Sequence, residues 1–81
     1  MKIEVLGPGC ADCRKLEKDV NSALTELGIE AEVVKVTDLN KISSYGVLMT
    51  PGLVINGKVY SSGKLPAIVA LKRWIEDEGK E

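Results

Sequence analysis

The chain passes from a strand into a helix within the stretch Ile3-Glu4-Val5-Leu6-Gly7-Pro8-Gly9-Cys10-Ala11-Asp12-Cys13. The apolar character of residues 3–6 indicates a short strand, and the Gly-Pro-Gly that follows ends it. Farther along, apolar residues recur at the spacing of one helical face. They are Leu16, Val20, Ala23, Leu24 and Leu27. Cys10 and Cys13 therefore stand where the strand gives way to the helix.

These two cysteines are the only ones in the chain. The N-terminus of a helix presents unpaired N–H groups and a partial positive charge, and both favour a thiolate over a thiol. A cysteine in such a place becomes nucleophilic near neutral pH. The motif therefore predicts reactive thiol chemistry at the start of the helix.

The composition describes one small domain, residues 1–81, with nearly balanced charge. Its 11 basic and 12 acidic side chains give no electrostatic reason to expect binding to nucleic acid or to an anionic membrane. No signal peptide and no segment of membrane-spanning length is visible, so the expected location is cytoplasmic. Thiols there are usually kept reduced. A Cys-x-x-Cys pair is then more typical of catalysis, redox sensing or metal binding than of a permanent cross-link.

Local signals divide the first half of the chain into helix, strand and helix. Residues 11–27 are predicted to form the first helix, which ends at Gly28. Residues 29–36 follow as a strand rich in β-branched residues. Asp38 is expected to cap a short second helix that ends at Gly46.

The second half of the chain carries a hairpin and a last helix. Residues 52–55 and 58–61 are predicted strands that flank Asn56-Gly57, the strongest short signal for a hairpin. Pro66 is expected in the first turn of the last helix, and residues 76–81 are expected to fray. The predicted order is β-α-β-α-β-β-α, an α/β fold with a four-stranded mixed sheet flanked by helices. The first two strands should be parallel, because a helix connects them.

This order, with Cys-x-x-Cys after the first strand and Thr50-Pro51 before the hairpin, resembles the thioredoxin fold in its shortest form. The chain looks most like the small archaeal and bacterial thioredoxin- and glutaredoxin-like proteins called redox-active disulfide protein 2. The residues that carry the match are 7–13, Leu16-Glu17, 46–57 and Ser62-Gly63. The resemblance covers essentially the whole chain.

The resemblance implies roles for Thr50 and Pro51. In that family the proline before the third strand is cis and packs against the active disulfide, and the residue before it pairs through its backbone with an incoming substrate. Pro51 is therefore the expected cis proline, and Thr50 the expected substrate-binding residue. The alternative is an ordinary trans proline that opens an edge strand, since only about 5–6% of X-Pro bonds in folded proteins are cis.

The expected activity is that of a thiol–disulfide oxidoreductase that reduces protein or small-molecule disulfides without a cofactor. Cys10 precedes the helix and should face solvent, so it is the predicted nucleophile. Cys13 shares a face with Leu16 and Val20, which indicates that it points inward as the resolving thiol. Attack by the first thiolate forms a mixed disulfide, and attack by the second releases the reduced product. The alternative is a pair of buried structural cysteines.

Two acidic residues near the cysteines have open roles. The negative charge of Asp12 disfavours a thiolate at the neighbouring cysteines, whereas the positive charges of Arg14 and Lys15 favour one. We expect the dithiol/disulfide couple to be reducing. Asp12 serves equally well as a helix cap. Glu4 lies where thioredoxins place a buried acid that assists proton transfer to the inner cysteine. An exposed edge carboxylate paired with a lysine is the preferred interpretation, so Glu4 is left out of the predicted site.

The expected partners are a disulfide-containing protein substrate and a thioredoxin-reductase-like electron donor. Met49 should line the rim around Cys10, where apolar surface suits a protein or peptide. Glutaredoxins bind glutathione through charged residues after the fourth strand, and the usual acidic pair is missing from residues 61–65.

Tyr45 and Trp74 are expected to be packing residues. The protein is expected to be a monomer.

Two other functions stay open. Heavy-metal-associated domains also carry Cys-x-x-Cys after a first strand and bind Cu(I) through two thiolates. They have a methionine where this chain has Pro8, and they end in a strand. Zinc is less suited, because a structural zinc site needs about four Cys and His ligands and the chain has no histidine. A non-enzymatic redox sensor or adaptor would use the same two thiols, so only turnover distinguishes it from an enzyme.

Overall fold

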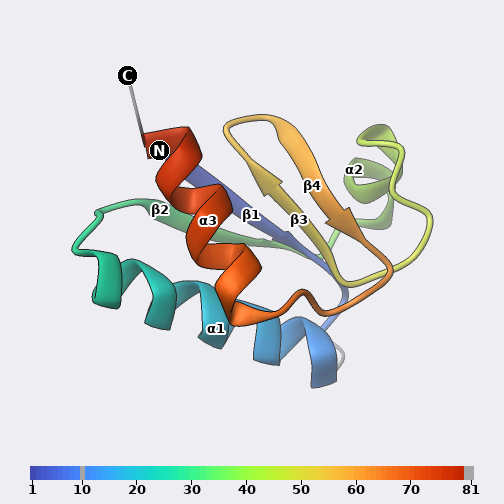
Figure 1. Ribbon diagram of the computed structural model, residues 1–81. Coiled ribbons are helices and arrows are strands. Elements are labelled where there is room, and N and C mark those ends of the chain that lie inside the picture. The colour runs from blue at the N-terminus through green and yellow to red at the C-terminus, as the bar shows by residue number, and fades with distance from the viewer. Residues whose placement is uncertain (10, 80–81) are drawn as a thin grey trace.

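The computed structural model describes residues 1–9 and 11–79. Its elements follow the predicted order β-α-β-α-β-β-α, as Figure 1 shows. They are β1 (Lys2–Leu6), α1 (Ala11–Leu27), β2 (Glu32–Val36), α2 (Leu39–Ser44), β3 (Gly52–Ile55), β4 (Lys58–Ser62) and α3 (Ile68–Gly79). The predicted α/β class is confirmed.

The strands of the described chain form one mixed sheet in the order β2-β1-β3-β4. β1 is parallel to β2 and antiparallel to β3, so Ile3 lies opposite Val33 on one side and Ile55 on the other. β1 is therefore a central strand. The hairpin between β3 and β4 turns at Asn56 and Gly57, whose φ angles of 51° and 83° suit a two-residue turn.

Helices cover both faces of the sheet (Figure 1). α1 and α3 pack on one face, around a cluster that includes Ile3 and Leu16. The shorter α2 covers the other face, where Leu6 and Ile42 belong to a second cluster. Residues 53–55 of β3 are fully buried, because helices shield both sides of this strand.

α1 brings Cys13 to the sheet because its buried residues recur at every third or fourth position. They are Cys13, Leu16, Val20, Ala23 and Leu24. The helix ends at Gly28 as predicted, with a φ of 68°. Gly28 N donates to Thr25 O at 3.3 Å, and Ile29 N donates to Leu24 O at 3.1 Å. This pair of hydrogen bonds is the Schellman motif, which satisfies the last carbonyls of a helix.

β2 is shorter than the strand predicted over residues 29–36. It begins at Glu32, whose N–H donates to the carbonyl of Met1 at 2.9 Å. The parallel register places Lys2, the first residue of β1, opposite Glu32. Residues 29–31 therefore extend beyond the end of β1 in the sheet, and no neighbouring strand of the described chain pairs with them. The strand prediction was wrong for residues 29–31, which connect α1 to the sheet.

α3 begins and ends later than predicted. The carbonyl of Ala67 accepts the first helical bonds, from Ala70 N at 3.0 Å and Leu71 N at 3.1 Å. Pro66 therefore precedes the helix and does not lie in its first turn. The helix then runs on to Gly79.

The last turn of α3 is bound to the hairpin through Glu78. Asn56 Nδ2 donates to one carboxylate oxygen of Glu78 at 3.3 Å. Lys58 Nζ donates to the other oxygen at 3.2 Å, and the hydroxyl of Tyr60 donates to the same oxygen. The expected fraying from residue 76 was therefore wrong as far as Gly79.

Candidate active site

Cys13 lies in the first turn of α1 on the side that faces the sheet, and only 4% of its surface is exposed. It stands one turn before Leu16, which is fully buried. The inward position predicted for Cys13 is confirmed, while its role as the resolving thiol stays a prediction. Cys10 lies outside the described residues, so its role as the nucleophile also stays a prediction.

Gly7, directly after β1, lies against Cys13. A Cβ atom built on Gly7 would be 2.2 Å from Sγ of Cys13 and 3.6 Å from Cβ of Thr50. Gly7 is held there because its N–H donates to the carbonyl of Val36 at 2.9 Å. The sequence marks Gly7 as part of a strand break and of the family match, without a role in the site. Its position between a strand and an inward-facing cysteine is the signal that assigns it to the site.

The Thr50–Pro51 peptide bond is cis, as the family resemblance implies, and the trans alternative was wrong. Pro51 is buried, and its carbonyl accepts the N–H of Gly63 at 2.9 Å. Thr50 is half-buried beside Gly7. The structure thus brings Cys13, Gly7 and Thr50 together from three separate segments. Substrate binding by Thr50 and Pro51 stays a prediction.

The segment before Thr50 exposes two large apolar side chains. Leu48 is 91% exposed and Met49 is 68% exposed. Met49 also rests against Gly63, where a built Cβ would lie 3.0 Å from Cβ of Met49. Met49 therefore flanks the cis proline. Leu48 extends this apolar rim, and sequence reasoning missed it because local hydrophobicity suggests burial and not exposure.

Glu4 is buried, with only 4% of its surface exposed. Val34 and Val54 flank it in the sheet, and α2 covers this face of β1. The hydroxyl of Tyr45 donates to Oε1 of Glu4 at 2.7 Å. The other oxygen, Oε2, has no hydrogen-bond partner within the described part of the chain. The expectation of an exposed edge carboxylate paired with a lysine was wrong, because β1 is a central strand.

Tyr45 has a polar role in addition to the packing role expected of it. It forms the C-cap of α2 and packs against the second core cluster. Its hydrogen bond to Glu4 raises the pKa of the Tyr45 phenol, and partial burial adds to the rise. The neutral phenol is therefore held as a donor to the carboxylate.

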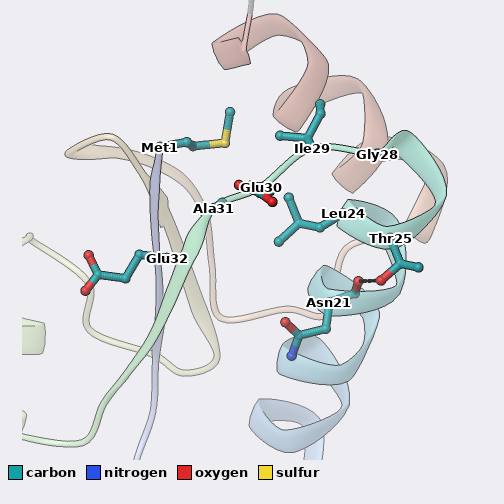
Figure 2. A pocket seen from close by; sticks show the side chains of 9 residues that line it. All are labelled: Met1, Asn21, Leu24, Thr25, Gly28, Ile29, Glu30, Ala31 and Glu32. Atoms are coloured by element: carbon teal, nitrogen blue, oxygen red, sulfur yellow. Dashed lines mark hydrogen bonds between the residues drawn. The ribbon is translucent and has the colours of Figure 1, made fainter.

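A surface hollow lies toward the far end of α1 from Cys13. Figure 2 shows it between the last turns of α1, the start of β2 and Met1. Asn21, at its edge, is eight residues beyond Cys13, which corresponds to about 12 Å along a helix. Its ionisable side chains are Glu30 and Glu32. The hollow is thus separate from the region around Cys13.

Among residues 1–9 and 11–79, no three His, Cys, Asp or Glu side chains gather closely enough to hold a metal ion. In the same residues, no helix has both the length and the apolar character needed to cross a bilayer. The described part of the candidate site consists of Cys13, Gly7 and the Thr50–Pro51 bond, with Glu4 buried in the adjoining strand.

Comparison with known proteins gives a consistent family match. The family model of the thioredoxin domain matches residues 1–76. A thioredoxin of Methanocaldococcus jannaschii is 39% identical over 80 residues, which cover 96% of this chain and 92% of that protein. A thioredoxin of Methanothermobacter thermautotrophicus is 37% identical over 73 residues, which cover 90% and 95%. The narrower grouping with redox-active disulfide protein 2 stays a prediction.

Proposed function

We propose that this chain, which belongs to the thioredoxin domain family, reduces disulfide bonds through a Cys10-x-x-Cys13 cycle. Family membership supports thiol–disulfide oxidoreductase activity in general terms. The observation that carries the specific proposal is the packing of buried Cys13 against Gly7, next to the cis Thr50–Pro51 bond. This arrangement suits a resolving thiol at the start of a helix, beside a place where substrate can bind.

The proposed cycle transfers two electrons from the dithiol to the substrate. The Cys10 thiolate attacks one substrate sulfur, so that a mixed disulfide forms and the first substrate thiolate leaves with the electron pair of the broken bond. The Cys13 thiol then loses its proton and attacks the sulfur of Cys10. A Cys10–Cys13 disulfide forms, and the second substrate thiolate leaves. Each departing thiolate takes up a proton from solvent.

The first turn of α1 supplies opposing electrostatic influences on this chemistry. Its N–H groups favour a thiolate, and so do the exposed cations Arg14 and Lys15. Asp12 opposes them, and because all three charged side chains are exposed, solvent and salt screen them alike. The sum favours a nucleophilic Cys10 at neutral pH.

Glu4 is the group we propose to accept the proton of Cys13. It lies on β1 three residues before Gly7, which is roughly 10 Å of strand, and Gly7 touches the Cys13 sulfur. A general base acts directly or through one water. We propose that one water bridges the carboxylate of Glu4 and the sulfur of Cys13. Its burial and its unpaired oxygen fit a group that exchanges a proton within the fold.

The proposed substrate is a disulfide-containing protein, and the proposed electron donor is a thioredoxin-reductase-like enzyme of the cytoplasm. Leu48 and Met49 present exposed apolar surface beside Thr50, which suits the chain of a protein substrate. The donor returns two electrons and two protons to the Cys10–Cys13 disulfide, and so closes the cycle.

Turnover with a generic disulfide tests the proposal. Insulin reduction is measured with dithiothreitol and with several reductases as electron donors. We expect repeated turnover by the parent chain, no turnover by Cys10→Ser, and accumulation of a mixed disulfide by Cys13→Ser. Circular dichroism of both variants checks that they remain folded.

Other outcomes would identify other functions. Tight equimolar binding of Cu(I) without reductase activity would indicate a soft-metal carrier. Oxidation and reduction of the thiols without turnover would indicate a redox sensor or adaptor.

A further inference from the structure

Tyr45 makes a contact that the packing of α2 does not require. Its hydroxyl donates to Oε1 of Glu4 at 2.7 Å, although the two residues are 41 positions apart in the sequence. A phenylalanine would fill the same volume, so the hydroxyl serves the polar contact. Oε2 of Glu4 stays buried without a partner among the described residues. Buried polar groups are paired in the great majority of cases, so this oxygen calls for a functional account.

The elements packed around Glu4 supply no second ionisable partner. Its neighbours in the sheet are Val34 on β2 and Val54 on β3, and Ile42 of α2 is buried on the same face. Apart from Glu4 itself, the charged residues on β1, on β2, on α2 and at the α2 cap are all exposed. They are Lys2, Glu32, Lys35, Asp38 and Lys41. The phenol of Tyr45 is therefore the polar group that these elements direct at Glu4.

The backbone fixes the place of the Tyr45 hydroxyl. Tyr45 N donates to Ile42 O at 3.2 Å, and Gly46 N donates to Ser43 O at 2.8 Å, so the end of α2 is closed. Gly46 has a φ of 79°, which turns the chain away toward the segment that carries the cis proline. A donor held by a closed helix end is already in place when its acceptor changes charge, and it needs no reorganisation.

We propose that Tyr45 is a positioning residue, which holds Oε1 of Glu4 so that the free Oε2 accepts the proton of Cys13. This inference rests on the proposed function. The proton leaves the thiol of Cys13 and reaches Oε2 through one water, while the sulfur keeps the electron pair with which it attacks Cys10. The hydrogen bond from Tyr45 holds one oxygen of the carboxylate, which leaves the other oxygen oriented for proton uptake.

The test separates the two steps of reduction. An aromatic disulfide with two coloured thiolate products is mixed with the reduced protein, so that the first release reports on Cys10 and the second on Cys13. Both rates are followed from about pH 5 to pH 9 in the parent, in Tyr45→Phe, in Glu4→Gln and in the double variant. Tyr60→Phe is the matched control, because Tyr60 also donates to a carboxylate, but on the face of the sheet that α3 covers.

We expect the pH profile of the second release in Tyr45→Phe to lie about fivefold below that of the parent, because the carboxylate of Glu4 loses the hydrogen bond that orients it. The first release should be unchanged. Glu4→Gln should slow the second release at least about tenfold, and adding Tyr45→Phe to it should have no further effect. Non-additivity of this kind is what a residue acting through Glu4 produces.

Three results would overturn the assignment of Tyr45. They are superimposable profiles for Tyr45→Phe and the parent, an equal decrease in Tyr60→Phe, and a full Tyr45→Phe effect in the Glu4→Gln background. An inactive parent chain counts instead against the proposed function. An active parent with superimposable profiles counts against Tyr45 alone.

Discussion

Gly7 gives the Cys13 sulfur its place because glycine carries no side chain. A methyl group there would lie 2.2 Å from Sγ, so the cysteine or the end of β1 would have to move. We expect Gly7→Ala to lower the free energy of unfolding by about 1–3 kcal/mol, the usual cost of overpacking a core. It should also slow the second step of disulfide reduction more than the first. Urea denaturation and the two-step aromatic disulfide assay measure these effects.

Gly79→Ala is the matched control for this substitution. A Cβ on Gly79 would make only ordinary contacts, 3.4 Å from Met1 and 3.8 Å from Ile29. We expect its effect on the free energy of unfolding to stay within about 0.5 kcal/mol. Parent-like stability and rates in Gly7→Ala would contradict the place of Gly7 in the site.

The individual site residues were predictable to different degrees. Local spacing sufficed to place Cys13 on the inner face of its helix, and the whole-chain resemblance implied the cis bond at Pro51. The burial of Glu4 could not be deduced in this way. It depends on β1 having a strand on each side, and on a tyrosine 41 positions away. Contacts of that kind are set by tertiary packing and leave no local signal.

The contact between α3 and the β3–β4 hairpin depends on the hydrogen bond from Tyr60 to Glu78. This bond lowers the pKa of Glu78 and raises the pKa of Tyr60 to about 12. The hydrogen bond forms between charged Glu78 and neutral Tyr60. It therefore contributes fully to the stability of the fold between pH 4.5 and 10, the ordinary pKa values of the two groups. It is lost as the pH falls through the lowered pKa of Glu78, and as the pH rises through the raised pKa of Tyr60.

We expect Tyr60→Phe to lower the midpoint of thermal unfolding near neutral pH, and this deficit should shrink toward both ends of the pH range. Melting curves followed by circular dichroism across the range measure it. Lys15→Ala removes an exposed ion pair with Asp19 (3.7 Å) and is the control, with an expected effect of at most a few tenths of a kcal/mol. A Tyr60→Phe deficit that stays constant down to about pH 2 would contradict the prediction.

The limits of the elements show the same division between local and long-range causes. Gly28 follows the end of α1, and the Asn56-Gly57 turn joins β3 to β4. Both lie where local signals place them. The packing role expected of Trp74 is also confirmed, since its ring lies 5.5 Å from that of Tyr60. The late end of α3 was missed because the partners of Glu78 come from the hairpin. A charged C-terminal segment is predicted to fray when the hydrogen-bond partners of its side chains are not evident from the sequence.

The fold as a whole was predictable because the local signals for the type and order of the elements agreed with one topology, although some element limits were wrong. The 17-residue helix α1 suits a parallel crossover between β1 and β2, and a two-residue turn returns β4 antiparallel to β3, so the order of elements left few arrangements. The pairing of β1 with β3 then brings buried Gly7 and Pro51 to the same end of the sheet. Thioredoxin-family membership agrees with this architecture.

At the scale of the whole molecule, we expect the Cys10–Cys13 pair to be a reducing couple. The exposed cations and helix N-terminus at α1 favour a thiolate only moderately, because exposed Asp12 acts against them. Equilibration in glutathione and dithiothreitol buffers should give a potential nearer to about −270 mV than to −120 mV. Asp12→Asn is the informative variant, and it should make the couple more oxidising because the thiolate gains stability. A parent potential near −120 mV would point to an oxidant.

Asn56 accepts the N–H of Lys2 at 3.0 Å and donates to Glu78 at 3.3 Å. Figure 1 shows the start of β1 beside the last turn of α3, and Gly7 lies about 16 Å farther along the strand. An affinity handle fused to either terminus would therefore anchor the molecule by the edge remote from its sulfur chemistry. Beads carrying the Cys13→Ser variant in this orientation would present the reactive face to a cell extract and retain its partners as covalent adducts.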